Sequence, residues 1–189
     1  MKKNLTELVF IIDKSDSMCG LEKDTIGGYN SMLEQQLKVD GEYIITTVLF
    51  DNRYELLHNR TDIRAIRPIT EKEYSVGGST ALLYAIGKTI HKIDTAQKNT
   101  AANYRAKKVM FVIITDGEEH ASLQYSAMQV KKMIKRQKEC YDWEFIFLGA
   151  NIDVVETARR QRHGVEFPHD ERDGIDIPCV RHCFRSLLG

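Results

Sequence analysis

Five side chains with oxygen donors, placed at three separate points of the sequence, could together hold a metal ion. They are Asp13, Ser15, Ser17, Thr80 and Asp116. All five are carboxylates or hydroxyls, and no imidazole or thiolate is among them. Hard cations with octahedral oxygen coordination prefer such ligands, so the sequence predicts a site for Mg²⁺ or Mn²⁺ rather than for zinc.

The spacing of the first three residues has a geometric reason. Alternate side chains of an extended segment point the same way, so Asp13, Ser15 and Ser17 are expected to converge. By the same argument Lys14 and Asp16 point away from the site.

The other two loops add a hydroxyl and a second carboxylate. Gly77 and Gly78 allow the Thr80 loop to approach closely, and Thr80 is then expected to open a helix. Asp13 and Asp116 would repel each other at one place, and a cation relieves this repulsion. The neutral hydroxyls leave the ion electron-poor, so it can accept one more anionic oxygen.

Each loop alone has a simpler interpretation, because Ser and Asp after a strand are often turn or cap residues. The coincidence of three such loops favours the metal site. Glu118 and Glu119, which follow Asp116, are interpreted as acids at a helix N-terminus rather than as ligands.

Elements that could position these residues alternate along the chain. Four near-continuous apolar runs predict buried strands at Leu8–Asp13, Tyr43–Phe50, Val109–Thr115 and Trp143–Leu148. Amphipathic stretches predict helices at about 21–37, 80–93 and 122–137. This alternation predicts an α/β fold with a Rossmann-like, mostly parallel sheet covered by helices on both faces. Tyr54–His58 is predicted as one short antiparallel edge strand. Ligands bind at the carboxyl ends of such strands, where the five oxygen donors stand.

The three loops together resemble the metal-ion-dependent adhesion site of von Willebrand factor A domains, in their bacterial, single-domain form. The resemblance covers about residues 5–151 and rests on "IIDKSDSM", "GGSTAL" and "ITDGEE". It implies a non-enzymatic module for protein–protein interaction, in which a partner's Asp or Glu binds the metal. It also implies Ser15, Ser17 and Thr80 as inner ligands, with Asp13 and Asp116 as supporting carboxylates.

Two alternatives remain. One is a Mg²⁺-dependent phosphohydrolase with Asp13 as nucleophile, although such enzymes want an acid two residues on, where this chain has Ser15. The other is a von Willebrand factor A domain with a purely structural metal.

The composition limits which binding partners and which cellular compartment are expected. The 189 residues fit one domain, and 27 basic residues balance 27 acidic ones. Without a basic excess, neither nucleic acid nor membrane is an expected partner. The run of basic residues in 131–138 is interpreted as a solvated helix face. Four scattered cysteines and the lack of a signal peptide predict a cytoplasmic protein.

The end of the chain departs from this pattern. We assign residues 1–160 to the domain and residues 161–189 to an atypical segment, rich in Arg, His and breakers, with room for a last strand and helix or an irregular tail. Either a shifted reading frame or a divergent, loop-rich end would explain this change in composition. Cys179, His182 and Cys183 are zinc-type ligands there, but no second Cys-x-x-Cys half accompanies them.

Overall fold

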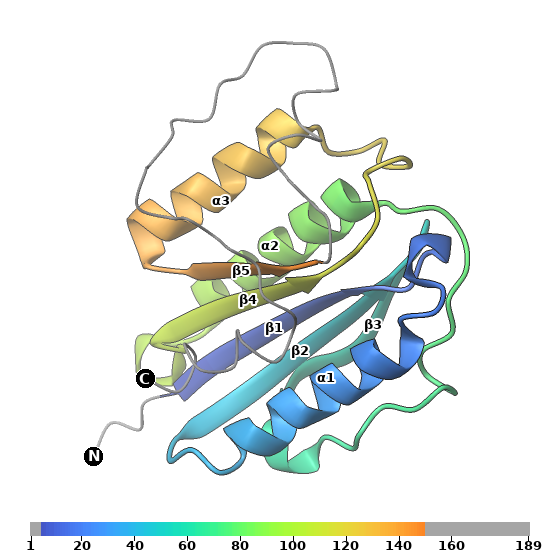
Figure 1. Cartoon of the computed structure of the whole chain (residues 1–189). Helices are drawn as coiled ribbons and strands as arrows, with labels where there is room; N and C mark the ends of the chain where they lie inside the picture. The colour runs from blue at the N-terminus through green and yellow to red at the C-terminus, as the bar shows by residue number, and fades with distance from the viewer. Residues whose placement is uncertain (1–4, 150–189) are drawn as a thin grey trace, which may run out of the picture.

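A five-stranded sheet forms the middle of this computed structural model, which describes residues 5–149 (Figure 1). Its strands are β1 (Leu5–Asp13), β2 (Glu42–Phe50), β3 (Tyr54–Asp62), β4 (Lys108–Ile114) and β5 (Glu144–Leu148). They lie in the order β3-β2-β1-β4-β5. β1 pairs in parallel with β2 and with β4, β4 pairs in parallel with β5, and β2 and β3 are antiparallel. The predicted mostly parallel α/β fold with an antiparallel edge strand is confirmed.

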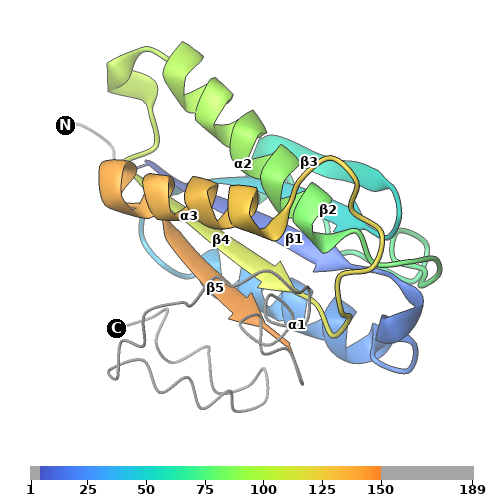
Figure 2. The ribbon, with the colours of Figure 1, turned by 90° about the horizontal axis from the view of Figure 1, so that it is seen from above.

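Helices cover both faces of this sheet. α1 (Glu22–Gln36) lies on one face, and α2 (Leu82–Asn99) and α3 (Ala127–Tyr141) lie on the other (Figures 1 and 2). Short 3-10 helices at Asp16–Met18, Ile63–Ala65 and Ala102–Tyr104 join these elements. Because helices cover both faces, the central strands are buried on both sides.

The central strand β1 shows why its sequence is almost continuously apolar. Phe10 belongs to the core on the α1 side, where its ring meets the edge of Tyr29 at 5.1 Å between centroids. Its neighbour Ile11 belongs to the core on the α2 side. Burying one such side chain contributes about 1.5–3 kcal/mol, so the run from Leu8 onward favours a doubly covered strand.

The edge strand β3 is longer than predicted, since it continues past His58 to Asp62. Register shifts interrupt its pairing with β2, and Arg60 has a positive φ of 52°. The guanidinium of Arg60 turns inward, where its Nε donates to Glu7 Oε1 at 3.0 Å. Burial still raises the pKa of Glu7, although Arg60 opposes the shift. The end of β3 has no apolar pattern because its residue Arg60 pairs with the buried carboxylate of Glu7.

Two helices begin later than predicted. α2 begins at Leu82, so the prediction that Thr80 opens it is wrong, and its N-cap residue Ala81 makes no side-chain cap. α3 begins at Ala127 with a capping box between Ser126 and Gln129. The segment between β4 and α3 is therefore a loop. Thr80 lies before the start of α2, so its hydroxyl can take part in another contact.

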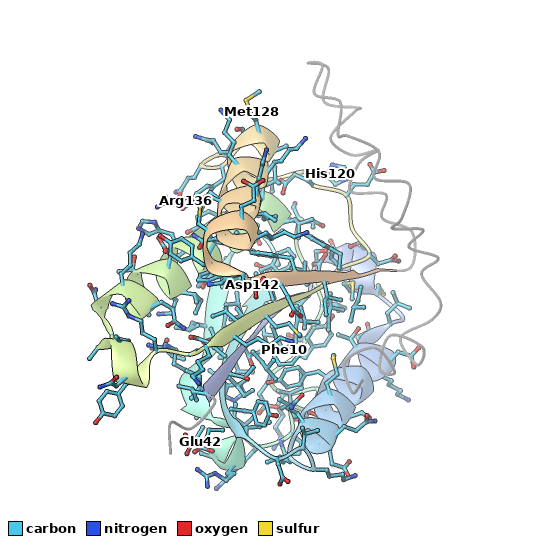
Figure 3. The ribbon with its side chains drawn as sticks, turned by 90° about the vertical axis from the view of Figure 1, so that its left-hand side faces the viewer. Phe10, Glu42, His120, Met128, Arg136 and Asp142 are labelled. Atoms are coloured by element: carbon cyan, nitrogen blue, oxygen red, sulfur yellow. The ribbon has the colours of Figure 1, made fainter. Side chains whose placement is uncertain are left out.

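The surface of α3 agrees with the interpretation of its basic run as a solvated face. Lys132, Lys135, Arg136 and Lys138 are exposed. Figure 3 shows Arg136 and Met128 on the outer side of α3, with Phe10 inside the molecule. No helix among residues 5–149 is long and apolar enough to cross a membrane. The predicted boundary at residue 160, the atypical segment and its Cys–His group lie outside the described residues.

Candidate metal centre

β1 ends at Asp13, whose side chain is fully buried at the rim of the sheet. One carboxylate oxygen, Oδ1, accepts a hydrogen bond from the Ser15 backbone N–H at 2.8 Å. The other, Oδ2, accepts one from the Thr115 hydroxyl at 2.6 Å, just past the end of the neighbouring strand β4. Burial raises the pKa of Asp13, although these hydrogen bonds oppose the shift. The buried carboxylate is thus held in a fixed orientation between two parallel strands.

The three predicted hydroxyls meet beside this carboxylate. Ser15 Oγ lies 2.9 Å from Ser17 Oγ, and Thr80 Oγ1 donates to Ser15 Oγ at 2.8 Å. Adjacent ligands of an octahedral ion with bonds of about 2.1 Å lie about 3 Å apart, so these spacings fit one Mg²⁺. Ser15 and Thr80 are buried and Ser17 is exposed. The predicted convergence of the hydroxyls is confirmed.

Gly117 packs directly against these oxygens. A Cβ atom built on it would lie 2.4 Å from Ser17 Oγ, 2.7 Å from Thr80 Oγ1 and 3.2 Å from Asp13 Oδ2. Two oxygens of the segment 13–17 and one oxygen of the Thr80 loop thus lie so close to Gly117 that a methyl group there would displace them. Their chemistry and spacing fit a small, hard cation.

Asp116 is the least defined of the five predicted ligands. It lies between Thr115, which donates to Asp13, and Gly117, and its side chain is partly exposed. Its backbone therefore belongs to the rim of the site. A role of its carboxylate as a ligand stays a prediction.

Backbone hydrogen bonds join the first two ligand loops. The Asp16 N–H donates to the Gly78 carbonyl at 2.9 Å, and the Gly77 N–H donates to the Lys14 carbonyl at 2.8 Å. Gly78 has a φ of +83°, and a Cβ atom there would lie 2.8 Å from Asn52 Oδ1. The expectation that glycine allows a close approach is confirmed at Gly78. At Gly77 there is room for a side chain.

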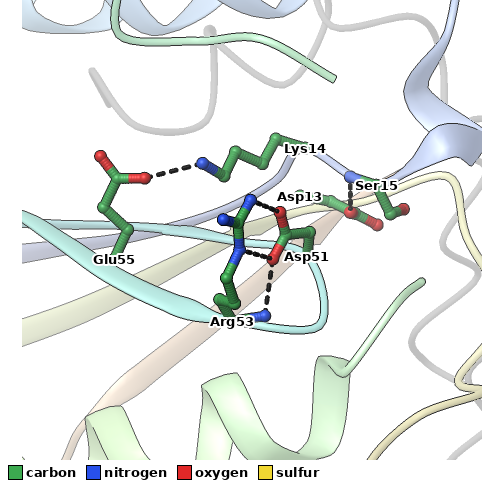
Figure 4. A network of polar contacts seen from close by, with 6 residues as sticks. All are labelled: Asp13, Lys14, Ser15, Asp51, Arg53 and Glu55. Atoms are coloured by element: carbon green, nitrogen blue, oxygen red, sulfur yellow. Dashed lines mark hydrogen bonds and ion pairs between the residues drawn. The ribbon is translucent and has the colours of Figure 1, made fainter. Parts of the chain in front are cut away.

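Lys14 points away from the hydroxyls, as predicted. Its Nζ lies 2.7 Å from Glu55 Oε2, while Asp51 is held by Arg53 (Figure 4). Burial works against ionisation of Asp51, but the hydrogen bonds from Arg53 outweigh it and lower the pKa of Asp51. The Asp51 carbonyl also accepts from the Ala81 N–H at 3.0 Å, which fixes the end of the Thr80 loop.

Three contributors to the site were not identified from the sequence. Thr115 and Gly117 flank Asp116 in the motif "ITDGEE", at the end of an apolar run, but the sequence assigned them no role of their own. Tyr74 donates from its hydroxyl to the Asp13 carbonyl at 2.5 Å. Since 61 residues separate Tyr74 from Asp13, no local pattern could indicate this contact.

The two acids after Asp116 differ in position. Glu118 is exposed, whereas Glu119 is buried and accepts from the Leu83 N–H at 2.7 Å, in the first turn of α2. The interpretation as an acid at a helix N-terminus is confirmed for Glu119, on a helix that precedes it in the chain. Within residues 5–149 no group of three or more His, Cys, Asp or Glu side chains could hold a metal ion. A metal at this rim therefore depends on the hydroxyls.

Comparison with known proteins identifies the fold. No protein-family model and no curated protein sequence matches this chain. Among solved structures, it matches the ArnB paralog VWA2 from Sulfolobus acidocaldarius (TM-score 0.50, 19% identity, 82% of this chain and 37% of that one). It also matches a von Willebrand factor type A protein from Catenulispora acidiphila (0.51, 15%, 84% and 41%). The chain has the von Willebrand factor A fold.

A third structure with this likeness is the PilB minor pilin from Streptococcus sanguinis, with a TM-score of 0.53 and 11% identity over 85% of this chain. The chain spans 37% to 60% of the length of these three proteins. At such low identity the likeness concerns the fold. The role of this chain therefore follows from its own site.

Proposed function

We propose that this von Willebrand factor A domain is a metal-dependent module for protein–protein interaction. It holds one Mg²⁺ or Mn²⁺ at the carboxyl ends of β1 and β4, and a partner protein supplies an Asp or Glu carboxylate. The proposal rests chiefly on one observation. The hydroxyls of Ser17 and Thr80 lie 2.9 and 2.8 Å from that of Ser15, beside the fully buried carboxylate of Asp13.

The chain's own groups have distinct parts in this proposal. Ser15, Ser17 and Thr80 would bind the metal through neutral hydroxyls, with Asp13 and Asp116 as supporting carboxylates. A bound ion would supply a Lewis-acidic position for one further anionic oxygen. Because most of the ligands are uncharged, the site keeps attraction for a partner's carboxylate.

The surroundings of Asp13 support this role over that of a phosphoryl nucleophile. Its side chain is fully buried, and both of its oxygens accept hydrogen bonds, from Ser15 and Thr115. A nucleophile needs an accessible oxygen and an acid that can protonate the leaving group. The residue two positions on is Ser15, which cannot serve as that acid.

Water-proton relaxation by Mn²⁺ tests the metal and the open position together. Binding to the protein should enhance the relaxation caused by Mn²⁺, and acetate should reduce this enhancement by displacing metal-bound water. Acetamide, which has nearly the same shape without the charge, should have little effect. Ser15→Ala should abolish the enhancement. Equal effects of acetate and acetamide would contradict the proposed recognition of carboxylates.

A further inference from the structure

Partly buried hydrogen bonds connect the loop after β4 to the first turn of α2. Glu119, which is 9% exposed, stands at their centre. Its Oε2 accepts from the Leu83 N–H at 2.7 Å and from the Ser122 hydroxyl at 2.8 Å. Its Oε1 accepts from the N–H groups of Ala121 at 2.9 Å and Ser122 at 2.6 Å. Protein donors therefore occupy both carboxylate oxygens.

Ser122 extends this connection by one residue along the helix. Its Oγ accepts from the Tyr84 N–H at 2.9 Å. In the reverse direction, the Thr80 carbonyl accepts from the N–H groups of His120 at 3.0 Å and Ala121 at 3.2 Å. The residues on either side of the start of α2 are thus bound to the same loop.

The contacts replace the cap that α2 lacks in its own sequence. Its N-cap residue, Ala81, provides no side-chain acceptor for the first turn. Unpaired N–H groups at a helix N-terminus need acceptors, and a carboxylate there also interacts favourably with the helix dipole. Further along, Tyr125 packs on Gly87, where a Cβ atom would lie 2.5 Å from its ring. The loop is therefore attached to α2 at two levels.

We infer that Glu119 is a positioning residue of the proposed metal centre, which ties the loop of Asp116 and Gly117 to the loop of Thr80. The inference rests on the proposed function, because it concerns the same site. The hydrogen bonds of Glu119 join the loop that carries Gly117 to the helix that follows Thr80. Thr80 Oγ1 is 2.7 Å from the Cβ position built on Gly117. A group that fixes this separation controls whether the oxygens can reach one ion together.

Residues that orient metal ligands affect affinity strongly although they do not touch the metal. Loss of such an outer partner typically reduces metal affinity by 10–100-fold. Glu119→Gln keeps the size of the side chain and one acceptor oxygen, but replaces the other oxygen with a donor facing N–H groups. We therefore expect Mn²⁺ to bind Glu119→Gln at least about tenfold more weakly than it binds the wild type.

Glu118→Gln provides the matched control for charge. It removes one negative charge from the adjacent residue of the same loop, at an exposed side chain. Mn²⁺ affinity would be measured for the full chain by the paramagnetic resonance signal of free Mn²⁺, at a temperature where circular dichroism shows each variant folded. The dissociation constant for Mn²⁺ should stay within about threefold of the wild-type value in Glu118→Gln, because water and salt screen the charge of an exposed side chain.

The outcomes separate the inference from the proposed function. Wild-type binding with unchanged affinity in Glu119→Gln would overturn the positioning role and leave the metal site intact. Equal losses in Glu118→Gln and Glu119→Gln would also overturn it, because charge alone would explain them. Absence of Mn²⁺ binding to the wild type would overturn the proposed function and this inference with it.

Ser122→Ala covers the case in which Glu119→Gln does not fold. This substitution removes the acceptor of the Tyr84 N–H and one donor to Glu119, while the carboxylate and its charge remain. A folded Ser122→Ala protein should bind Mn²⁺ several-fold more weakly than the wild type. Wild-type affinity in this variant would count against the inference.

Discussion

Replacing Gly117 with alanine should abolish metal binding while the domain stays folded. The added Cβ atom would lie 2.4 Å from Ser17 Oγ and 2.7 Å from Thr80 Oγ1. Ser17 Oγ would have to retreat by about 0.6 Å to reach even 3.0 Å, the lower limit of real Cβ contacts. Metal–ligand distances tolerate only about 0.2 Å, so at least one hydroxyl would be lost as a ligand.

The expected loss follows from this displacement. Outer partners of a metal site are worth 10–100-fold in affinity, so the loss of an inner ligand should cost at least about 100-fold, or about 2.8 kcal/mol. The strain in the metal-free protein should be smaller, because overpacking by one methyl group costs about 1–3 kcal/mol. Gly117→Ala should therefore fold, melt somewhat earlier than the wild type, and gain no thermal stability from Mg²⁺.

Thermal melts with EDTA and with saturating MgCl₂ provide the assay. The wild type should be stabilised by Mg²⁺, since a ligand of the native state raises the free energy of unfolding. The control is Gly27→Ala, within α1, where a Cβ atom has nothing within 4 Å. It should keep the full Mg²⁺ effect and gain about 0.5–1 kcal/mol from its helical preference. A Mg²⁺ effect of wild-type size in Gly117→Ala would refute the reasoning.

Three predictions concern the fold. Burial raises the pKa of Tyr29 from 10.0 to about 12, so the folded state holds a proton that the unfolded state releases. The free energy of unfolding should then fall by about 1.4 kcal/mol per pH unit between about pH 10 and 12. Urea titrations should show a smaller fall over this pH range in Tyr29→Phe than in the wild type, and equal falls in the two proteins would contradict the prediction. Ser126→Ala removes the N-cap of α3, so chemical denaturation should show a loss of about 1 kcal/mol, and a loss close to zero would argue against the capping box. Phe111→Ala removes a fully buried ring that stacks on Trp143, with 5.5 Å between the ring centroids. Unfolding followed by tryptophan fluorescence should show that the free energy of unfolding falls by about 3–5 kcal/mol, and a fall below about 1 kcal/mol would be inconsistent with this packing.

The buried strands could be predicted because their residues are apolar on both faces. β1, β2, β4 and β5 lie within a few residues of the predicted ranges. The edge strand β3 was predicted too short, since its polar end at Arg60 pairs with the buried Glu7 and shows no apolar pattern. A contact between residues far apart in the sequence leaves no periodicity to detect.

The candidate site divides in the same way. The prediction that the hydroxyls of Ser15 and Ser17 converge is confirmed, but the reason given for it is wrong, because the chain forms a 3-10 helix at Asp16–Met18 instead of staying extended. The role of Thr80 as a helix opener was wrong, because Glu119 caps α2 from a loop that follows it in the chain. The close packing of Gly117 against the ligands depends on how three loops meet, and this arises only from the tertiary fold.

Calorimetric titration of Mg²⁺ and Mn²⁺ into EDTA-stripped protein tests the central claim most directly, with Asp13→Ala and Ser15→Ala measured beside the wild type. We predict saturable binding at one site in the wild type and none in either variant, with the circular dichroism of all three alike. Binding that persists in both variants, or no binding to a folded wild type, would contradict the proposed metal centre.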